Sequence, residues 1–250
     1  MLRAFAEGRI FGDVFGDGTP RVIWLHGWGR SSADFREAGE SLAARGIASV
    51  ALDLPGFGAT PAPETPMGAR GYAALIESVV HEATHGEPFV IVGHSFGGRI
   101  AAVLGSQSID GLRGLVFAGA PLVARSGSRR RAPRAYRLVR SAAKLHLVSN
   151  ARLEAAKQKY GSVDYRNATG VMRDVLVATV NESYEAELAA IVVPCTFVWG
   201  AGDTDVPFDV AQRASQLLTG ASVVREIPDC GHLVPRDNAA ALVDAVEELL

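Results

Sequence analysis

The most constraining feature of this chain is a regular alternation of short apolar runs with longer segments of helical periodicity. The runs are rich in β-branched or aromatic residues, and they cover residues 21–25, 48–52, 89–92, 115–118 and 196–199. Runs that are apolar on both faces are typical of parallel strands with helices packed on either side of the sheet. Helical segments complete the pattern at 33–44, 72–83, 96–104 and from Asp237 onward. The alternation therefore predicts an α/β fold.

Three further runs extend the predicted sheet to eight strands. Residues 2–5 and 10–15 flank a turn that contains Glu7-Gly8-Arg9, which predicts an antiparallel hairpin at the sheet edge. Residues 223–227 predict the last strand, before the C-terminal helix. We therefore expect a mainly parallel eight-stranded sheet flanked by helices.

Residues 121–188 interrupt the alternation, because they contain no strand-like run. Helical segments at 132–147, 151–160 and 171–184 fill this region and predict a small helical cap over one end of the sheet. The predicted organisation is a core of residues 1–120 and 189–250 with a cap at 121–188. We interpret the cap's basic series as a solvated helix face rather than a site for an anionic substrate or membrane. It comprises Arg129, Arg130, Arg131, Arg134, Arg137, Arg140 and Lys144.

Composition excludes several kinds of partner. The 250 residues are 48% hydrophobic and 21% charged, as in a globular domain, and a net charge of −2 attracts neither nucleic acid nor an anionic membrane. The N-terminal residues form a poor signal peptide, and the longest apolar stretch, 191–199, is too short for membrane insertion. Two cysteines, Cys195 and Cys230, fit a reduced cytoplasmic protein. Because no His, Cys and Asp residues have metal-ligand spacing and no Gly-x-Gly-x-x-Gly follows the first strand, we expect a small-molecule substrate and no metal or cofactor.

The sequence GHSFG at 93–97 makes Ser95 a candidate nucleophile. With 27 glycines and 16 serines in the chain, roughly 0.2 chance matches to Gly-x-Ser-x-Gly are expected, so the motif alone is a hypothesis. Its context strengthens the hypothesis, because it follows one predicted strand and opens a helix. A sharp turn there strains the serine backbone, and the flanking glycines remove side chains that would clash.

A nucleophilic serine requires a general base, and one histidine has the most favourable position. His232 follows the last predicted strand in the sequence Pro228-Asp229-Cys230-Gly231-His232, at the end of the sheet where ligands bind. Other roles fit the remaining histidines, which are His26, His81, His85, His94 and His146. We expect His26 to fix backbone geometry and His94 to point away from the serine.

Two aspartates in the loop after the predicted strand at 196–199 compete for the role of orienting acid. Asp203 follows a glycine-rich turn and is the preferred candidate, whereas Asp205 is expected to cap the helix that opens near Phe208. The predicted triad therefore has the chain order Ser95, Asp203, His232.

This order, together with the sequence motifs around it, resembles the α/β-hydrolase superfamily over essentially the whole chain. The matching motifs are HGWG at 26–29, DLPGFG at 53–58, GHSFG at 93–97, WGAGDTDVP at 199–207 and GH at 231–232. The resemblance implies that the backbone N–H groups of Trp28 and Phe96 form the oxyanion hole. We expect Asp53 to fix its own loop through hydrogen bonds.

The resemblance also narrows the chemistry. Haloalkane dehalogenases and epoxide hydrolases of this superfamily carry aspartate at the nucleophile position, so Ser95 argues against both activities. Hydrolases of aromatic ring-cleavage products often carry Trp after the catalytic histidine, so Leu233 weakens the case for carbon–carbon bond hydrolysis. Residues 117–121 offer no carboxylate as an alternative acid, which favours Asp203. The substrate pocket is expected to involve the side chains of Trp28, Phe96, Met172 and Leu233, although core or cap packing suits several of them equally.

The predicted function is a serine esterase that cleaves a small or medium hydrophobic ester through an acyl-enzyme. One alternative keeps the triad but breaks a carbon–carbon bond, as a hydrolase or lyase. A second is a non-catalytic ligand receptor on the same fold, and a third is a perhydrolase or haloperoxidase-like side activity of the same serine.

Overall fold

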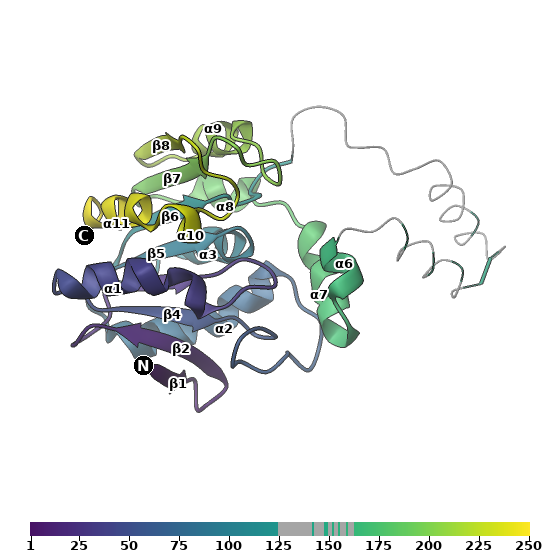
Figure 1. Cartoon of the computed structure of the whole chain (residues 1–250), viewed down its shortest axis with the longest axis horizontal. Helices are drawn as coiled ribbons and strands as arrows, with labels where there is room; N and C mark the ends of the chain where they lie inside the picture. Colours follow the sequence, from purple (N-terminus) through teal and green to yellow (C-terminus); the bar gives the residue numbers. More distant parts are fainter. Residues whose placement is uncertain (125–141, 143–147, 150–151, 153–154, 156–158, 160–162) are drawn as a thin grey trace.

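A computed structural model describes residues 1–124 and 163–250 of the chain, together with positions 142, 148–149, 152, 155 and 159 (Figure 1). The expected helices at 132–147 and 151–160, the basic series from Arg129 to Lys144, and His146 lie outside the described residues, a few single positions excepted.

The core is an eight-stranded sheet with strand order β1-β2-β4-β3-β5-β6-β7-β8. Strands β3 to β8 are parallel to one another, whereas β2 pairs antiparallel with both β1 and β4. The strands are β1 (Leu2–Phe5), β2 (Ile10–Phe15), β3 (Val22–Leu25), β4 (Ser49–Asp53), β5 (Phe89–His94), β6 (Leu112–Ala118), β7 (Cys195–Gly200) and β8 (Ser222–Ile227). The predicted mainly parallel sheet with an antiparallel hairpin at its edge is confirmed.

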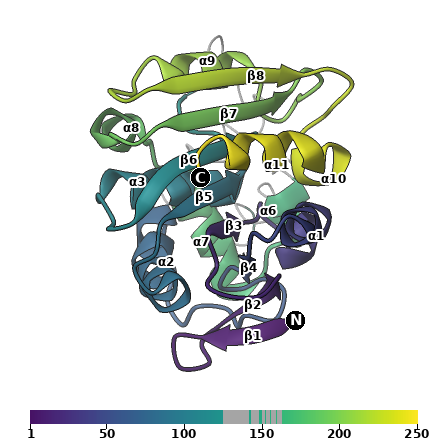
Figure 2. The same cartoon turned by 90° about the vertical axis from the view of Figure 1, so that its left-hand side faces the viewer.

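Helices cover both faces of this sheet (Figure 2). One face carries η1 (Ser32–Phe35), α1 (Arg36–Ala44), α10 (Val234–Asp237) and α11 (Ala239–Glu247). The other face carries α2 (Ala69–Thr84), α3 (Phe96–Ser106), α8 (Glu185–Ala190) and α9 (Asp209–Ser215). Along β3, Ile23 and Leu25 pack into the second layer, whereas Val22 and Trp24 pack into the first. This two-sided burial explains why the central strands read as continuous apolar runs.

Two helices within the interval 121–188 stand at one end of the sheet in Figure 1: α6 (Val163–Asn167) and α7 (Gly170–Val180). The expected helix at 171–184 ends earlier, because residues 181–184 form the connection to α8. Leu188 of α8 is fully buried in the core, so the chain has rejoined the helical layer there. None of the helices in the described ranges combines the length and the apolar character that a bilayer crossing needs.

Candidate active site

Ser95 stands in a strained turn between β5 and α3. Its backbone has φ 49° and ψ −108°, a left-handed conformation that a residue with a Cβ adopts only at an energetic cost. The turn brings α3 against the end of β3, where a Cβ on Gly97 would overlap the carbonyl oxygen of Leu25. A Cβ on Gly93 would overlap the carbonyl oxygen of Gly97, so both glycines of the motif are sterically required.

Ser95, Asp203 and His232 come together at the ends of β5, β7 and β8. The His232 Nε2 atom lies 3.1 Å from Ser95 Oγ, and its Nδ1 atom lies 2.8 Å from Asp203 Oδ2. Asp203 is buried, and its other oxygen accepts the backbone N–H groups of Asp205 at 2.9 Å and Val206 at 2.7 Å. These bonds fix the carboxylate with one oxygen aimed at the imidazole.

Asp205 has a different position from the one expected. It is exposed and lines the cavity in front of His232, whereas α9 begins after Phe208 without a hydrogen bond from any capping side chain. The expectation that Asp205 caps this helix is therefore wrong.

The backbone N–H groups of Trp28 and Phe96 are available as donors beside Ser95. Within the part of the chain that the structure describes, neither donates a hydrogen bond to another protein group. Phe96 is the first residue of α3, where N–H groups have no partner inside the helix. The Gly97 N–H donates to the His26 carbonyl at 3.0 Å, which ties the loop carrying Trp28 to this helix.

Asp53 fixes its own loop through a hydrogen bond to Ala59, as expected, and it also binds the neighbouring loop at Ser32. Its Oδ1 atom accepts the Ser32 N–H at 2.7 Å, and its Oδ2 atom accepts the Ala59 N–H at 2.8 Å. Both carboxylate oxygens are thus used for loop structure.

His26 also fixes backbone geometry. Its Nε2 atom accepts the Leu54 N–H at 3.0 Å, so the ring proton resides on Nδ1, which donates to the Gly27 carbonyl at 2.7 Å. Complete burial lowers the pKa of His26 to about 4. The ring therefore stays neutral at pH 7.

His94 contacts the candidate base His232, a contact that the sequence does not indicate. Its Nε2–H donates to the His232 backbone carbonyl at 2.9 Å, and the two imidazole ring centroids are 5.0 Å apart. Its Nδ1 atom is buried without a hydrogen-bond partner. Burial, aided by the neighbouring His232, lowers the pKa of His94 to about 4. His94 thus braces the loop that carries the candidate base, a contact that sequence reasoning missed.

A cavity of about 600 Å³ opens in front of Ser95 and His232. Trp28, Phe96 and Leu233, three of the side chains expected at the substrate pocket, line this cavity. The ring of Trp28 packs edge-on against Phe96, with a centroid separation of 5.6 Å. Met172 is absent from the lining and its side chain lies against Gly56, so the placement expected for it is wrong. Helix α7 instead contributes Leu176, Thr179 and Val180.

Charged side chains also line this cavity: Arg30, Arg99, Asp164 and Asp205. Arg30 is neutralised by Asp34, with 2.6 Å between Nε and Oδ2. Arg99 donates from Nη1 to the Thr179 carbonyl at 2.8 Å, while its buried Nε has no hydrogen-bond partner. Burial and the nearby Asp205 raise the pKa of Asp164. Sequence reasoning missed Arg99, although it follows Ser95 by four residues and therefore shares its face of α3.

In the described ranges, no group of three or more His, Cys, Asp or Glu side chains is placed to hold a metal ion. Cys195 and Cys230 are buried free thiols, and burial raises the pKa of Cys195 to about 12.

Comparison with known proteins gives the family and the fold of the chain. Residues 22–245 match the alpha/beta hydrolase family. A 2-succinyl-6-hydroxy-2,4-cyclohexadiene-1-carboxylate synthase from Salmonella newport is 26% identical over 253 residues, covering 93% of this chain and 94% of the relative. An esterase from Exiguobacterium antarcticum has a TM-score of 0.73 at 19% identity, covering 99% of this chain and 97% of the other. A bromoperoxidase from Bacillus anthracis has a TM-score of 0.72 at 20% identity, covering 96% and 94%. At these identities the two solved structures show the fold alone.

Proposed function

The chain belongs to the alpha/beta hydrolase family, and we propose that it is a serine esterase that cleaves a small or medium hydrophobic ester through an acyl-enzyme. The observation that carries this proposal is the hydrogen-bonded line from Ser95 Oγ through His232 to Asp203, at 3.1 Å and 2.8 Å. A serine, a base and an orienting acid in this order are the groups that acyl transfer needs.

In the proposed reaction, Ser95 Oγ attacks the ester carbonyl carbon while His232 Nε2 takes the hydroxyl proton. The negative charge that develops on the carbonyl oxygen is received by the N–H groups of Trp28 and Phe96. Collapse of this intermediate breaks the bond to the alcohol, which leaves with the proton from His232. Water then attacks the acyl-enzyme by the same route, which releases the acid and regenerates Ser95. Asp203 stabilises the imidazolium formed in each half of the cycle.

The walls of the cavity support a hydrophobic acyl group. Apolar side chains from the core and from α7 line the same cavity as Ser95: Trp28, Phe96, Leu176, Val180 and Leu233. Its volume of about 600 Å³ lies within the range of about 300–1,000 Å³ that small-molecule sites occupy. We further propose a cytoplasmic enzyme without metal or cofactor, in which residues 121–188 form a helical cap on a core of 1–120 and 189–250.

The second candidate is a lyase that uses the same triad. It would either cleave a carbon–carbon bond or eliminate a group from the substrate to form a carbon–carbon double bond. The Salmonella relative is named for a synthase reaction whose product is a carboxylate. The positively charged Arg99 in the cavity of this chain favours such a substrate, because its buried Nε–H lacks an acceptor. In an elimination, His232 would take a proton from one carbon, the C–H electron pair would form a double bond to the neighbouring carbon, and the leaving group would depart from that second carbon with the electron pair of its bond.

Two assays with purified protein separate the candidates. The first follows hydrolysis of nitrophenyl esters from acetate to dodecanoate by the natural chain and by Ser95→Ala; the second follows formation of 2-succinyl-6-hydroxy-2,4-cyclohexadiene-1-carboxylate. Ester turnover that disappears in Ser95→Ala, with no activity in the second assay, is the expected result. Turnover in the second assay alone would replace the esterase by the lyase. The absence of activity in both assays would contradict the enzyme proposal and favour a non-catalytic ligand receptor.

A further inference from the structure

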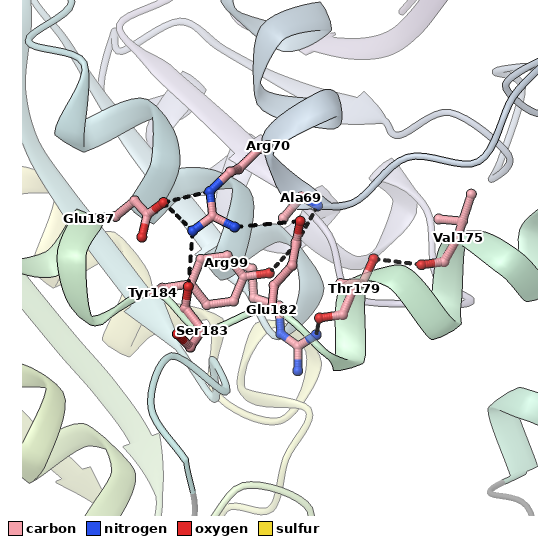
Figure 3. Close-up of polar contacts among 9 residues, drawn as sticks. All are labelled: Ala69, Arg70, Arg99, Val175, Thr179, Glu182, Ser183, Tyr184 and Glu187. Carbon is pink, nitrogen blue, oxygen red and sulfur yellow. Dashed lines mark hydrogen bonds and ion pairs between the residues drawn. The ribbon is translucent and has the colours of Figure 1, made fainter.

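A cluster of charged side chains joins α7 to the core beside the cavity, and Figure 3 shows it in detail. We call it the anchor cluster. It comprises Arg70 from α2, Arg99 from α3, and Glu182, Tyr184 and Glu187 from the segment after α7. Two arginines face two glutamates, so the cluster balances its own charge.

Glu182 makes the central contacts of the anchor cluster. Its Oε2 atom accepts the Ala69 N–H at 2.8 Å and the Tyr184 hydroxyl at 2.7 Å, and its Oε1 atom lies 3.6 Å from Arg70 Nη1. Ala69 is the first residue of α2, a helix of 16 residues, so Glu182 satisfies an N–H that has no partner inside the helix. A Cβ on Gly68 would overlap the Glu182 carboxylate, which shows how closely the segment approaches the helix start.

Arg70 and Tyr184 surround this carboxylate. Arg70 donates to Glu187 Oε1 at 2.7 Å from Nε and to the Ser183 carbonyl at 3.1 Å from Nη2. The fully buried ring of Tyr184 has the guanidinium carbons of Arg70 and Arg99 at 5.7 Å and 5.9 Å from its centroid. Two cations against one aromatic ring give the cluster a defined geometry.

Arg99 links the anchor cluster to the reacting atoms. It lies four residues after Ser95 on α3 and donates to the carbonyl of Thr179, whose hydroxyl donates to the Val175 carbonyl at 2.8 Å within α7. Thr179 and the adjacent Val180 line the cavity. One guanidinium therefore fixes the end of α7 relative to the helix that begins at the candidate nucleophile.

We propose that the anchor cluster sets the position of α7 over Ser95 and thereby the acyl size that the cavity accepts, with Glu182 and Arg99 as positioning residues that determine specificity. This inference rests on the esterase function proposed above. Removal of the Glu182 carboxylate leaves the Ala69 N–H and the Tyr184 hydroxyl without their acceptor and leaves the arginines in excess. The end of α7 then loosens, while the triad, which makes no contact with Glu182, keeps its geometry.

The test compares Glu182→Ala with Glu185→Ala, a matched control in the same segment for which no polar contact is found in the described part of the chain. Hydrogen exchange of residues 170–180 is measured together with KM and kcat for the nitrophenyl ester series. Glu182→Ala removes the acceptor of two hydrogen bonds, so we expect exchange in α7 to accelerate at least about tenfold, the factor that corresponds to the loss of one charge-assisted hydrogen bond. For the ester that the natural chain hydrolyses with the highest kcat/KM, KM should rise about threefold to tenfold, and kcat should change less than about threefold. The acyl group with the highest kcat/KM should become a longer one.

Glu182→Gln keeps an acceptor oxygen for the Ala69 N–H and should show a smaller effect on each measurement, which preserves the test if the alanine variant does not fold. Unchanged α7 exchange in both variants, or an equal change in Glu185→Ala, would overturn the proposal. A fall in kcat at constant KM would also overturn it, because that result would place Glu182 in the chemistry. If the natural chain hydrolyses no ester, the esterase proposal fails, while the exchange measurement still decides whether the cluster holds α7.

Discussion

Two regions meet at the cavity, and they are held by different forces. Ser95, Asp203 and His232 sit at the ends of buried parallel strands. Helix α7 is attached through side chains that join distant parts of the chain, such as Glu182 to Ala69 across 113 positions. The strand ends are fixed by the whole sheet, whereas α7 packs one face on the core through Val175 and is joined at its C-terminal end by a few charged contacts. Under the proposed function, the reaction takes place at the strand ends, and we propose that α7 determines which substrate is accepted.

Burial shows the same contrast. Val90 and Val92 of β5 are fully buried, whereas α7 buries only one face: Val175 is fully buried, but Val177 and Val180 are 41% and 57% exposed. Since apolar burial is the main favourable term in folding, α7 contributes much less to stability than the central strands do.

The largest expected effect tests the rigid region. Asp203→Asn keeps an oxygen for the N–H groups of Asp205 and Val206 but turns an amide toward His232 Nδ1, which favours the wrong tautomer. We expect kcat for a nitrophenyl ester to fall about 10⁴-fold. Asp205→Asn, the control, should change kcat less than about threefold. The reverse ranking would show that the acid has been assigned to the wrong carboxylate.

The next effect concerns stability, and it also belongs to the rigid region. His26 and His94 have pKa values of about 4 in the folded state against 6.5 as the ordinary value, so between these pH values the unfolded chain binds more protons. The free energy of unfolding should therefore decrease as the pH falls from about 6.5 to about 4, by up to about 3 kcal/mol for each ring. Urea titrations at pH 7 and pH 4.5 measure this difference. His26→Asn and His94→Asn should each reduce it, and an unchanged pH dependence would contradict the assignment.

A smaller effect is expected from His94, which supports the base through the His232 carbonyl. His94→Leu removes this donor and leaves the half-buried carbonyl of His232 without it, so we expect kcat to fall about tenfold with KM unchanged. His94→Gln retains an N–H donor and should recover part of the loss. Equal activity of the natural chain and His94→Leu in steady-state assays would remove His94 from the site.

The smallest effect tests the variable region. Leu176→Ala enlarges the cavity from the α7 side, so the ratio of kcat/KM for octanoate to that for butyrate should rise about threefold. Val177→Ala changes the neighbouring residue, which lies outside the lining, and should leave this ratio unchanged. A decrease in kcat for all esters in Leu176→Ala would contradict the division between the two regions.

The difference between the strand ends and α7 also explains which features could be predicted from the sequence and which could not. Strand patterns and loop motifs are local, so the sheet could be predicted, and Ser95, Asp203 and His232 lie together in the structure. The orientation of His94 depends on a carbonyl 138 positions away, which local spacing does not encode. Which face of α7 meets the cavity depends on contacts with distant elements, such as the Arg99 bond to the Thr179 carbonyl, and local periodicity does not encode them. Met172 is therefore expected from the sequence where the structure has Leu176 and Val180. Arg99 had a usable signal in its four-residue spacing from Ser95.

The central claim is that Ser95 is the nucleophile, and covalent labelling tests it most directly. The natural chain is treated with a fluorophosphonate, and the adduct is located by mass spectrometry of proteolytic peptides. One adduct per chain on Ser95, formed in step with the loss of ester hydrolysis and absent in His232→Ala on the same timescale, is the predicted result. Labelling at another residue, or full ester hydrolysis by a chain whose Ser95 carries the adduct, would contradict the claim.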